Sequence, residues 1–343
     1  MDLLQLRSVK ALAEQLLKRG QRIDAVVWNA GVAGWKGLDW PRAIWAVMTD
    51  LVHATTYPTY PIGIPGLVTK KQLSSEGDQK TQAKEEPQLG QVFTANVFGH
   101  YMLTHWLAPL LPATSRIVWI SSISALPSTF SPNDIQALTS HTAYESSKRL
   151  TDLLVLTSHL PSTSPYVSSF LPTSTLTHAS RPKMYLTHPG VVGTSIAGLH
   201  WLLDALMFLA FYLARLLNSP WHVITPYKGA IAAVYTVLSP ADQLPSAEES
   251  DGKGKWGSAT DVLGNERVAR TETEGWGFCG VPGKVPAGSV RGGRYRKMKT
   301  TTKEVREEFE EVGRGAWREL EGMRKEWEGL LGPLNLDDPV DVQ

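Results

Sequence analysis

The sequence predicts an α/β protein with a Rossmann-like, doubly wound parallel sheet. Three short apolar segments, at residues 23–28, 116–120 and 184–187, have the composition of buried strands. Each segment is followed by a turn or a serine cluster, and stretches with helical periodicity lie between them. Because strands and helices alternate along the chain, we expect parallel strands with helices covering the sheet.

Composition excludes several classes of protein. The 343 residues include 42% hydrophobic and 20% charged side chains, which is enough for one large domain with a buried core. The formal charge of +1 provides no field that would attract nucleic acid, so no nucleic-acid partner is expected. Cys279 is the single cysteine and no Cys/His cluster has zinc-ligand spacing, so we predict neither a disulfide nor a metal site. The first 24 residues lack the apolar core of a secretory signal, and the catalytic part is expected to face the cytoplasm.

The N-terminal third begins with a helix and a strand. Apolar residues recur at helical spacing over residues 3–17, Gly20 ends this helix, and the strand at 23–28 follows. Residues 35–90 form an insertion. Its first part is rich in tryptophan and is expected to pack, whereas the polar tract at 70–88 is expected to be a mobile loop.

The middle of the chain continues this alternation. Residues 92–111 predict a long helix that Pro112 ends, before the strand at 116–120. A further helix is predicted over 143–156, and the third strand, 184–187, stops at His188-Pro189-Gly190. We assign residues 1–245 to this sheet domain.

One stretch is unusually apolar. Between residues 199 and 217, 16 of 19 side chains are apolar or aromatic, interrupted by Asp204 and Arg215. Two charges make insertion across a bilayer costly, so we expect an interfacial or buried helix.

The remaining residues predict an extension and a final helix. Residues 246–300 are Gly-rich and basic, and residues 301–331 form an amphipathic helix with Thr301 and Glu304 as a capping box. We expect this helix to pack on its own domain; partner binding is the alternative.

The chemistry is most sharply indicated by Tyr144 and Lys148. A tyrosine and a lysine four residues apart on a helix project from the same face. In ketone reduction the phenol protonates the developing alkoxide, and a nearby ammonium lowers the pKa of the phenol. Tyr295 and Lys299 have the same spacing, but they lie in a basic loop without flanking strands, so we interpret them as a decoy.

Two further side chains complete the predicted catalytic set. Ser122 follows a strand and is expected to donate a hydrogen bond to the substrate carbonyl, with Ser121 and Ser124 as rivals. Asn96 is expected to bond a water or the backbone near Lys148.

In order along the chain, these motifs resemble the short-chain dehydrogenase/reductase family over about residues 1–245. The resemblance implies NADPH as cofactor and Tyr144 as proton donor. The positions that it implies for cofactor binding are Asp2, Asn29, Ala30, Gly31, Tyr144, Lys148, Pro189, Gly190, Val192 and Thr194. Within them, Asp2 would contact adenine, and Pro189, Gly190 and Thr194 would lie over the nicotinamide.

A finer resemblance narrows the branch of this family. The motifs that carry it are Trp119-Ile120-Ser121-Ser122, Ser219-Pro220-Trp221-His222, Pro226-Tyr227-Lys228-Gly229 and Lys255-Trp256-Gly257-Ser258. They are similar to the branch that reduces the C3 ketone of sterols in fungal sterol biosynthesis. That similarity implies a sterol ketone substrate, sterol C4-demethylation proteins as partners, and a location on the cytoplasmic face of the endoplasmic reticulum membrane or a lipid droplet.

The sequence departs from the family at its start. No Thr-Gly-x-x-x-Gly-x-Gly phosphate loop occurs, and only 28 residues precede Asn29. We therefore expect an N-terminally truncated fold that begins after the family's third strand, either from a truncated gene model or as a compromised product. The alternative functions are reduction of another steroid or lipid carbonyl, and a non-catalytic scaffold.

Overall fold

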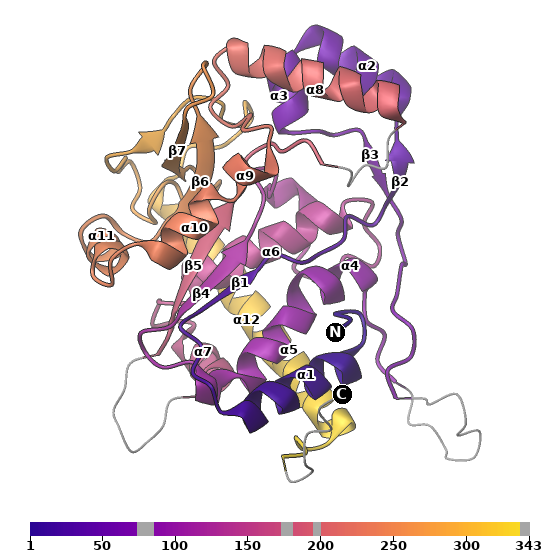
Figure 1. Ribbon diagram of the computed structural model, residues 1–343, viewed down its shortest axis with the longest axis vertical. Coiled ribbons are helices and arrows are strands. Elements are labelled where there is room, and N and C mark those ends of the chain that lie inside the picture. Colours follow the sequence, from indigo (N-terminus) through magenta and orange to yellow (C-terminus); the bar gives the residue numbers. More distant parts are fainter. Residues whose placement is uncertain (74–85, 173–180, 195–199, 337–343) are drawn as a thin grey trace.

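A six-stranded sheet forms the centre of the protein (Figure 1). The structure is a computed structural model that describes residues 1–73, 86–172, 181–194 and 200–336. In spatial order the strands are β1 (Ala25–Trp28), β4 (Arg116–Ile120), β5 (Lys183–His188), β6 (Lys255–Thr260), β7 (Glu266–Thr271) and β8 (Ser289–Val290). The first four run parallel, β7 is antiparallel to β6, and β8 is parallel to β7. A separate hairpin pairs β2 (Trp35–Leu38) with β3 (Pro61–Gly63).

Helices cover both faces of this sheet. One face is covered by α1 (Leu6–Arg19), α5 (Gly99–Trp106), α6 (Ala143–Thr157), α7 (Ser164–Phe170) and α12 (Lys303–Leu331). The other face is covered by α9 (Pro226–Gly229), α10 (Ile231–Leu238) and α11 (Gln243–Asp251). Val118 and Tyr185 pack on this second layer, whereas Ile117 and Leu186 face the first. The predicted doubly wound α/β class is therefore confirmed.

The predicted elements lie close to their observed positions. The α1 helix ends at Gly20, whose φ of 63° is in the left-handed region and whose N–H donates to the carbonyls of Leu16 and Leu17. The long helix expected over 92–111 is helical but broken into parts. It consists of α4 (Gln91–Phe93), a π-helical segment (Thr94–Phe98), α5 and a 3-10 turn (Ala108–Leu110).

The C-terminal part differs in two details from the prediction. The stretch 246–300, expected as an extension, contains β6 and β7, which continue the central sheet. The predicted cap Thr301 is wrong, because the hydroxyl of Thr302 accepts from the N–H of Val305 at the start of α12. The apolar stripe of α12 packs on the domain as expected, with Phe309, Trp317 and Trp327 in the main core.

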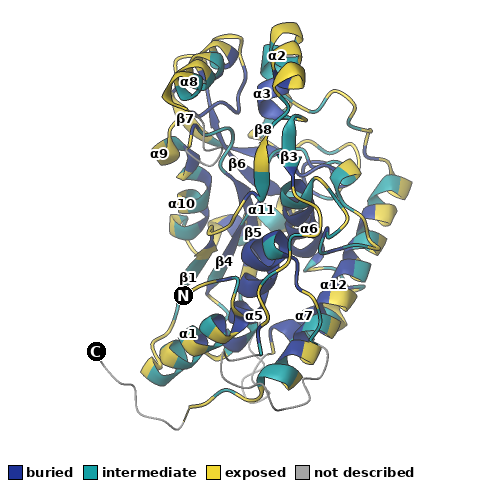
Figure 2. Ribbon diagram, turned by 90° about the vertical axis from the view of Figure 1, so that its right-hand side faces the viewer, coloured by how far each residue is buried: buried dark blue, intermediate teal, exposed yellow. Residues whose placement is uncertain are grey.

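The insertion forms a lobe at one end of the molecule. Its helix α3 (Leu51–Thr56) packs against both α2 (Trp40–Thr49) and α8 (Trp201–Leu216), and much of α2 and α8 is exposed (Figure 2). Most of the loop expected at 70–88 lies outside the described residues, as does residue 199. Within the described ranges, no helix is long and apolar enough to cross a bilayer.

Candidate active site

Three predicted turns meet at one edge of the sheet. Trp28 pairs with Trp119, and Ile120 with Thr187, so the carboxyl ends of β1, β4 and β5 lie in register. The Asn29-Ala30-Gly31 turn, the serine cluster and Pro189-Gly190 follow these three ends directly. Ligands of open α/β sheets bind at this edge, so the topology brings the predicted motifs together.

Tyr144 and Lys148 lie in the first turns of α6, which follows the serine cluster. The Lys148 Nζ is 5.6 Å from the centroid of the Tyr144 ring and donates a hydrogen bond of 2.9 Å to the carbonyl of Ile120, at the end of β4. The Trp35 ring, from β2 of the insertion, meets the Tyr144 ring edge-on with centroids 5.4 Å apart. The pair therefore shares one helix face, as its spacing predicts, and the insertion contributes a wall beside it.

Burial dominates the protonation of this pair. It raises the pKa of Tyr144 to about 12, and the nearby Glu145 carboxylate contributes in the same direction. Burial also lowers the pKa of Lys148 to about 8, although Asp152 opposes this shift. The phenol pKa is therefore raised rather than lowered as expected, because desolvation is the largest cause and Lys148 is not among the groups that shift it.

Asn96 anchors the turn after β1 to the catalytic helix. Its Oδ1 accepts from the N–H of Val32 at 2.8 Å, and its Nδ2 donates to the Val32 carbonyl at 3.0 Å and to the Ser147 hydroxyl at 3.0 Å. A Cβ at Gly31 would lie 2.5 Å from Asn96 Oδ1, so only glycine fits there. The side chain comes from the π-helical segment, a feature frequent at functional sites. It therefore bonds the backbone of Val32 and the hydroxyl of Ser147, the residue before Lys148, rather than the backbone beside Lys148.

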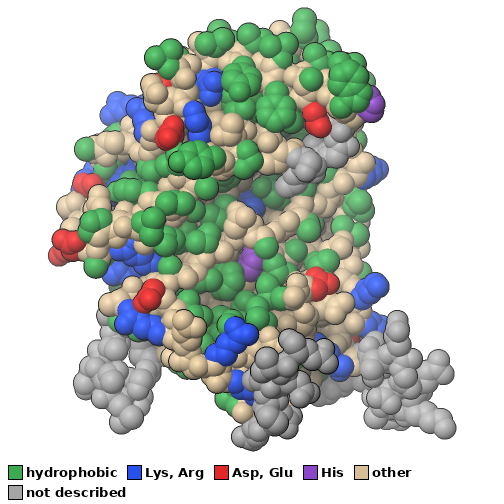
Figure 3. Space-filling view, in the orientation of Figure 1, with side chains coloured by type: hydrophobic (Ala, Val, Ile, Leu, Met, Phe, Trp, Pro, Cys, Tyr) green, Lys and Arg blue, Asp and Glu red, His purple; other side chains and the backbone are tan. Residues whose placement is uncertain are grey.

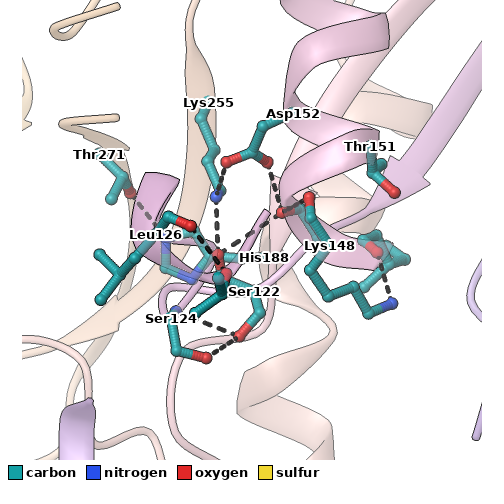
Figure 4. A network of polar contacts seen from close by, with 12 residues as sticks. Ser122, Ser124, Leu126, Lys148, Thr151, Asp152, His188, Lys255 and Thr271 are labelled. Atoms are coloured by element: carbon teal, nitrogen blue, oxygen red, sulfur yellow. Dashed lines mark hydrogen bonds and ion pairs between the residues drawn. The ribbon is translucent and has the colours of Figure 1, made fainter. Parts of the chain in front are cut away.

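The serine cluster separates into two environments (Figure 4). Ser121 is buried, and its hydroxyl donates to Asp152 Oδ1 at 2.5 Å. Ser122 is half-buried, and its Oγ lies 2.9 Å from the Oγ of Ser124. Because the Ser121 hydroxyl is committed to a buried carboxylate, Ser122 and Ser124 are the better placed candidates for a substrate oxygen.

A buried ion pair supports the site from behind. Lys255 Nζ, at the start of β6, is 2.8 Å from Asp152 Oδ2 and donates at 2.7 Å to the carbonyl of Ser122. Both side chains are almost fully buried. The pair thus ties α6, β6 and the serine loop into one network (Figure 4).

The turn after β5 is held by His188. Its Nδ1 accepts from the N–H of Gly190 at 3.0 Å, so its Nε2 carries the proton and donates to Thr271 Oγ1 at 2.7 Å. Burial lowers the pKa of His188 well below its usual value, which keeps the ring neutral. Gly190 has a φ of 72°, and a Cβ there would lie 2.6 Å from the Trp221 carbonyl.

The other residues predicted to bind the cofactor do not converge on the site as those above do. Val192 forms a parallel bridge with Ile224, and Thr194 is exposed at the end of a described range. Asp2 is exposed before α1, where its Oδ1 accepts from the N–H of Leu4. The turn residues Asn29 and Ala30 are also exposed.

The sequence alone did not single out Asp152 or His188. Asp152 follows Lys148 by four residues on the same helix, so its spacing was an available signal. His188 precedes the predicted Pro-Gly turn, but its partner Thr271 lies 83 residues away. The decoy pair is confirmed to lie outside regular structure, where the Tyr295 ring packs on His53 and Tyr57.

The residues present fit part of a nicotinamide cofactor. Gly31 and Gly190 leave room for close approach at the sheet edge, and Lys148 supplies a buried cation. These groups suit a nicotinamide and its ribose, whereas the chain has no glycine-rich loop for the pyrophosphate. No group of possible metal ligands occurs among the described residues.

Comparison with known proteins identifies relatives along nearly the whole chain. The 3-keto-steroid reductase of Aspergillus fumigatus is 44% identical over 96% of this chain and 76% of its own length. That of Gibberella zeae is 36% identical with the same coverage, and that of Schizosaccharomyces pombe is 31% identical over 80% of this chain and 70% of its own.

Two other comparisons, with protein-family models and with solved structures, give less information about the family. No protein-family model matches the chain. A short-chain dehydrogenase from Salmonella enterica has a TM-score of 0.32 and 18% identity over 69% of this chain and 66% of its own, so the assignment depends on the sequence relatives. The chain belongs to the 3-keto-steroid reductases.

Proposed function

We propose that the chain carries the site for NADPH-dependent reduction of a sterol C3 ketone to the 3-hydroxyl, in sterol biosynthesis of the ergosterol type. The observation that carries this proposal is the placement of Tyr144 and Lys148 on one helix face, with Lys148 bonded to the carbonyl at the carboxyl end of β4. The names of the relatives supply the substrate class. Reduction of another steroid or lipid carbonyl is the nearest alternative, because the site residues determine the reaction more than the substrate.

In this proposal Tyr144 is the proton donor. A pKa near 12 keeps its phenol protonated at neutral pH, so the O–H is available to the carbonyl oxygen as the C–O bond becomes single. Ser122 donates a hydrogen bond to the same oxygen and orients it. Lys148, close to the Tyr144 ring, stabilises the phenolate that remains until solvent returns the proton.

Bound NADPH would supply the hydride that adds to the carbonyl carbon. Asn29, Gly31, Lys148 and Gly190 are the residues of this chain best placed to hold its nicotinamide half. Asn96 is a positioning residue. Its hydrogen bonds to Val32 and Ser147 hold the turn after β1 against α6.

The test compares the chain with two single variants. With saturating NADPH and a detergent-dispersed 3-keto steroid, Tyr144→Phe should lower the rate of NADPH consumption by about 10²–10⁴-fold, the usual contribution of a general acid. Tyr295→Phe is the matched control and should retain the activity. Equal losses in both variants, or none in Tyr144→Phe, would refute the assignment.

A titration of NADPH by fluorescence tests the cofactor separately. Because the chain has no glycine-rich loop, we expect a Kd weaker than micromolar. Micromolar or tighter binding would contradict that expectation.

A second candidate function is that of a non-catalytic scaffold in a sterol C4-demethylation complex. A scaffold would bind no NADPH, and Tyr144→Phe would complement a strain lacking the protein as well as the unchanged chain does. For either function we propose a location on the cytoplasmic face of the endoplasmic reticulum membrane or a lipid droplet.

A further inference from the structure

About half of the exposed large hydrophobic side chains in the described ranges lie on two helices at one end of the molecule. Figure 3 shows hydrophobic side chains gathered over this end, where Figure 1 places α2 and α8. We call this the α2–α8 surface. Its members are Trp40, Ile44, Trp45, Met48, Trp201, Leu202, Leu206, Phe208, Leu209, Tyr212, Leu213, Leu216 and Leu217.

The polarity of α8 is the reverse of that of a helix on a water-soluble surface. Its two charged side chains, Asp204 and Arg215, are half-buried, and Asp204 Oδ1 and Arg215 Nε have no hydrogen-bond partner in the described structure. Leu206 and Leu209 are 53% and 54% exposed on the outer side. The charged side chains are thus partly withdrawn while leucine is exposed, which indicates a nonaqueous neighbour.

The α2 helix adds exposed apolar side chains at the same end of the molecule. Its exposed side chains Ile44, Trp45 and Met48 are 60%, 73% and 81% exposed and lie at helical spacing. Bulky side chains such as these tryptophan, isoleucine and methionine residues are typical of helices that enter the acyl boundary of a bilayer.

A basic loop at residues 291–299 packs against the base of this lobe. Arg296 Nη1 lies 2.5 Å from Asp50 Oδ2, at the start of α3, and the Tyr295 ring stacks on His53 with centroids 5.3 Å apart. Arg291 and Lys297 form no ion pair within the part of the chain that the structure describes. Basic residues thus flank an apolar surface, a combination that favours an anionic interface.

We propose that the α2–α8 surface docks on an anionic lipid bilayer, with α8 lying in the plane of the interface and the 291–299 loop contacting lipid phosphates. The α8 helix has 16 residues, or about 24 Å, which is shorter than the roughly 30 Å hydrocarbon core. It therefore suits lying on the membrane rather than crossing it. This proposal deepens the membrane location proposed above, but docking requires neither cofactor nor catalysis.

The surface also adjoins the candidate active site. A Cβ at Gly193, just after the Pro189-Gly190 turn, would lie 2.4 Å from the Phe208 ring of α8. On the other side, Trp35 of β2 contacts Tyr144 just before the chain enters α2. If the proposed function holds, an apolar ketone would move from the bilayer to the site between these two elements.

Vesicle flotation of the full chain tests the docking without substrate or NADPH. We expect binding to phosphatidylcholine vesicles that contain phosphatidylserine, and weaker binding to phosphatidylcholine alone. Leu206→Gln/Leu209→Gln should lower the partition coefficient on the order of 100-fold, since two exposed leucines lose their burial in lipid. Arg291→Gln/Lys297→Gln should lower it roughly 30-fold on anionic vesicles only.

Matched controls lie on helices away from this end. Val234→Gln/Leu238→Gln on α10 and Lys303→Gln/Lys325→Gln on α12 should leave the partition coefficient unchanged. Equal losses in the control and test variants, or no vesicle binding by the unchanged chain, would overturn the proposal. So would a lipid-free dimer that the α8 variants dissociate, because the surface would then join two copies of the chain.

Discussion

Lys255→Met should destabilise the fold strongly, because it leaves a carboxylate without its cation in the interior. Lys255 Nζ lies 2.8 Å from Asp152 Oδ2, and the two side chains are 3% and 0% exposed. Removing one member of a buried ion pair costs about 3–5 kcal/mol, a large share of the roughly 5–15 kcal/mol of a typical domain. The change also removes the hydrogen bond to the Ser122 carbonyl.

Urea denaturation followed by tryptophan fluorescence measures this loss. Lys303→Met is the matched control, since its ion pair with Glu307 is exposed and should contribute less than about 0.5 kcal/mol. The double variant Lys255→Met/Asp152→Leu should be more stable than the sum of its single changes implies. If Lys255→Met costs less than about 1 kcal/mol, or the two changes are additive, our account of the buried pair is wrong.

The remaining predictions concern three buried histidines, the glycine of the turn after β5 and a glycine on α12. Burial lowers the pKa of His100, His159 and His222 to about 4, so the unfolded chain binds more protons between pH 4 and 6.5. The free energy of unfolding should therefore be highest above pH 6.5 and should fall below pH 6.5, by at most about 1.4 kcal/mol per pH unit for each histidine. Urea midpoints that stay constant from pH 7 to 5 would contradict this prediction. Gly190→Ala should cost more than about 2 kcal/mol, since it combines a positive φ with a backbone clash. On the exposed side of α12, Gly322→Ala meets no atom within 4 Å and should stabilise the chain by about 0.5–1 kcal/mol; thermal unfolding of both variants gives the comparison.

Local patterns predict much of this fold. The β4 strand has the predicted bounds, because a short run of apolar and β-branched residues lies between Pro112 and a serine cluster. The π-helical segment at Thr94–Phe98 was not predicted, since a shift of one residue in the hydrogen-bond ladder leaves the apolar spacing nearly unchanged. The cap of α12 was misplaced by one residue, because two adjacent threonines were both eligible.

The site was predictable where its residues are close in sequence. The spacing of Tyr144 and Lys148 places them on one helix face. It does not show how deeply that face is buried, and burial reverses the expected shift in the phenol pKa. The ion pair of Asp152 and Lys255 joins residues 103 apart. Such a pair depends on the register between β5 and β6, which no local pattern contains.

The position of α12 has a consequence for synthesis on the ribosome. This last described helix contributes Trp317, Leu320 and Trp327 to the core formed by α5, α6 and α7. Until these side chains emerge, Tyr101 and Phe170 lack their partner Trp317. The apolar surfaces of the earlier elements therefore stay uncovered until residues 303–331 have been translated, and a nascent chain of this kind is a natural client for chaperones.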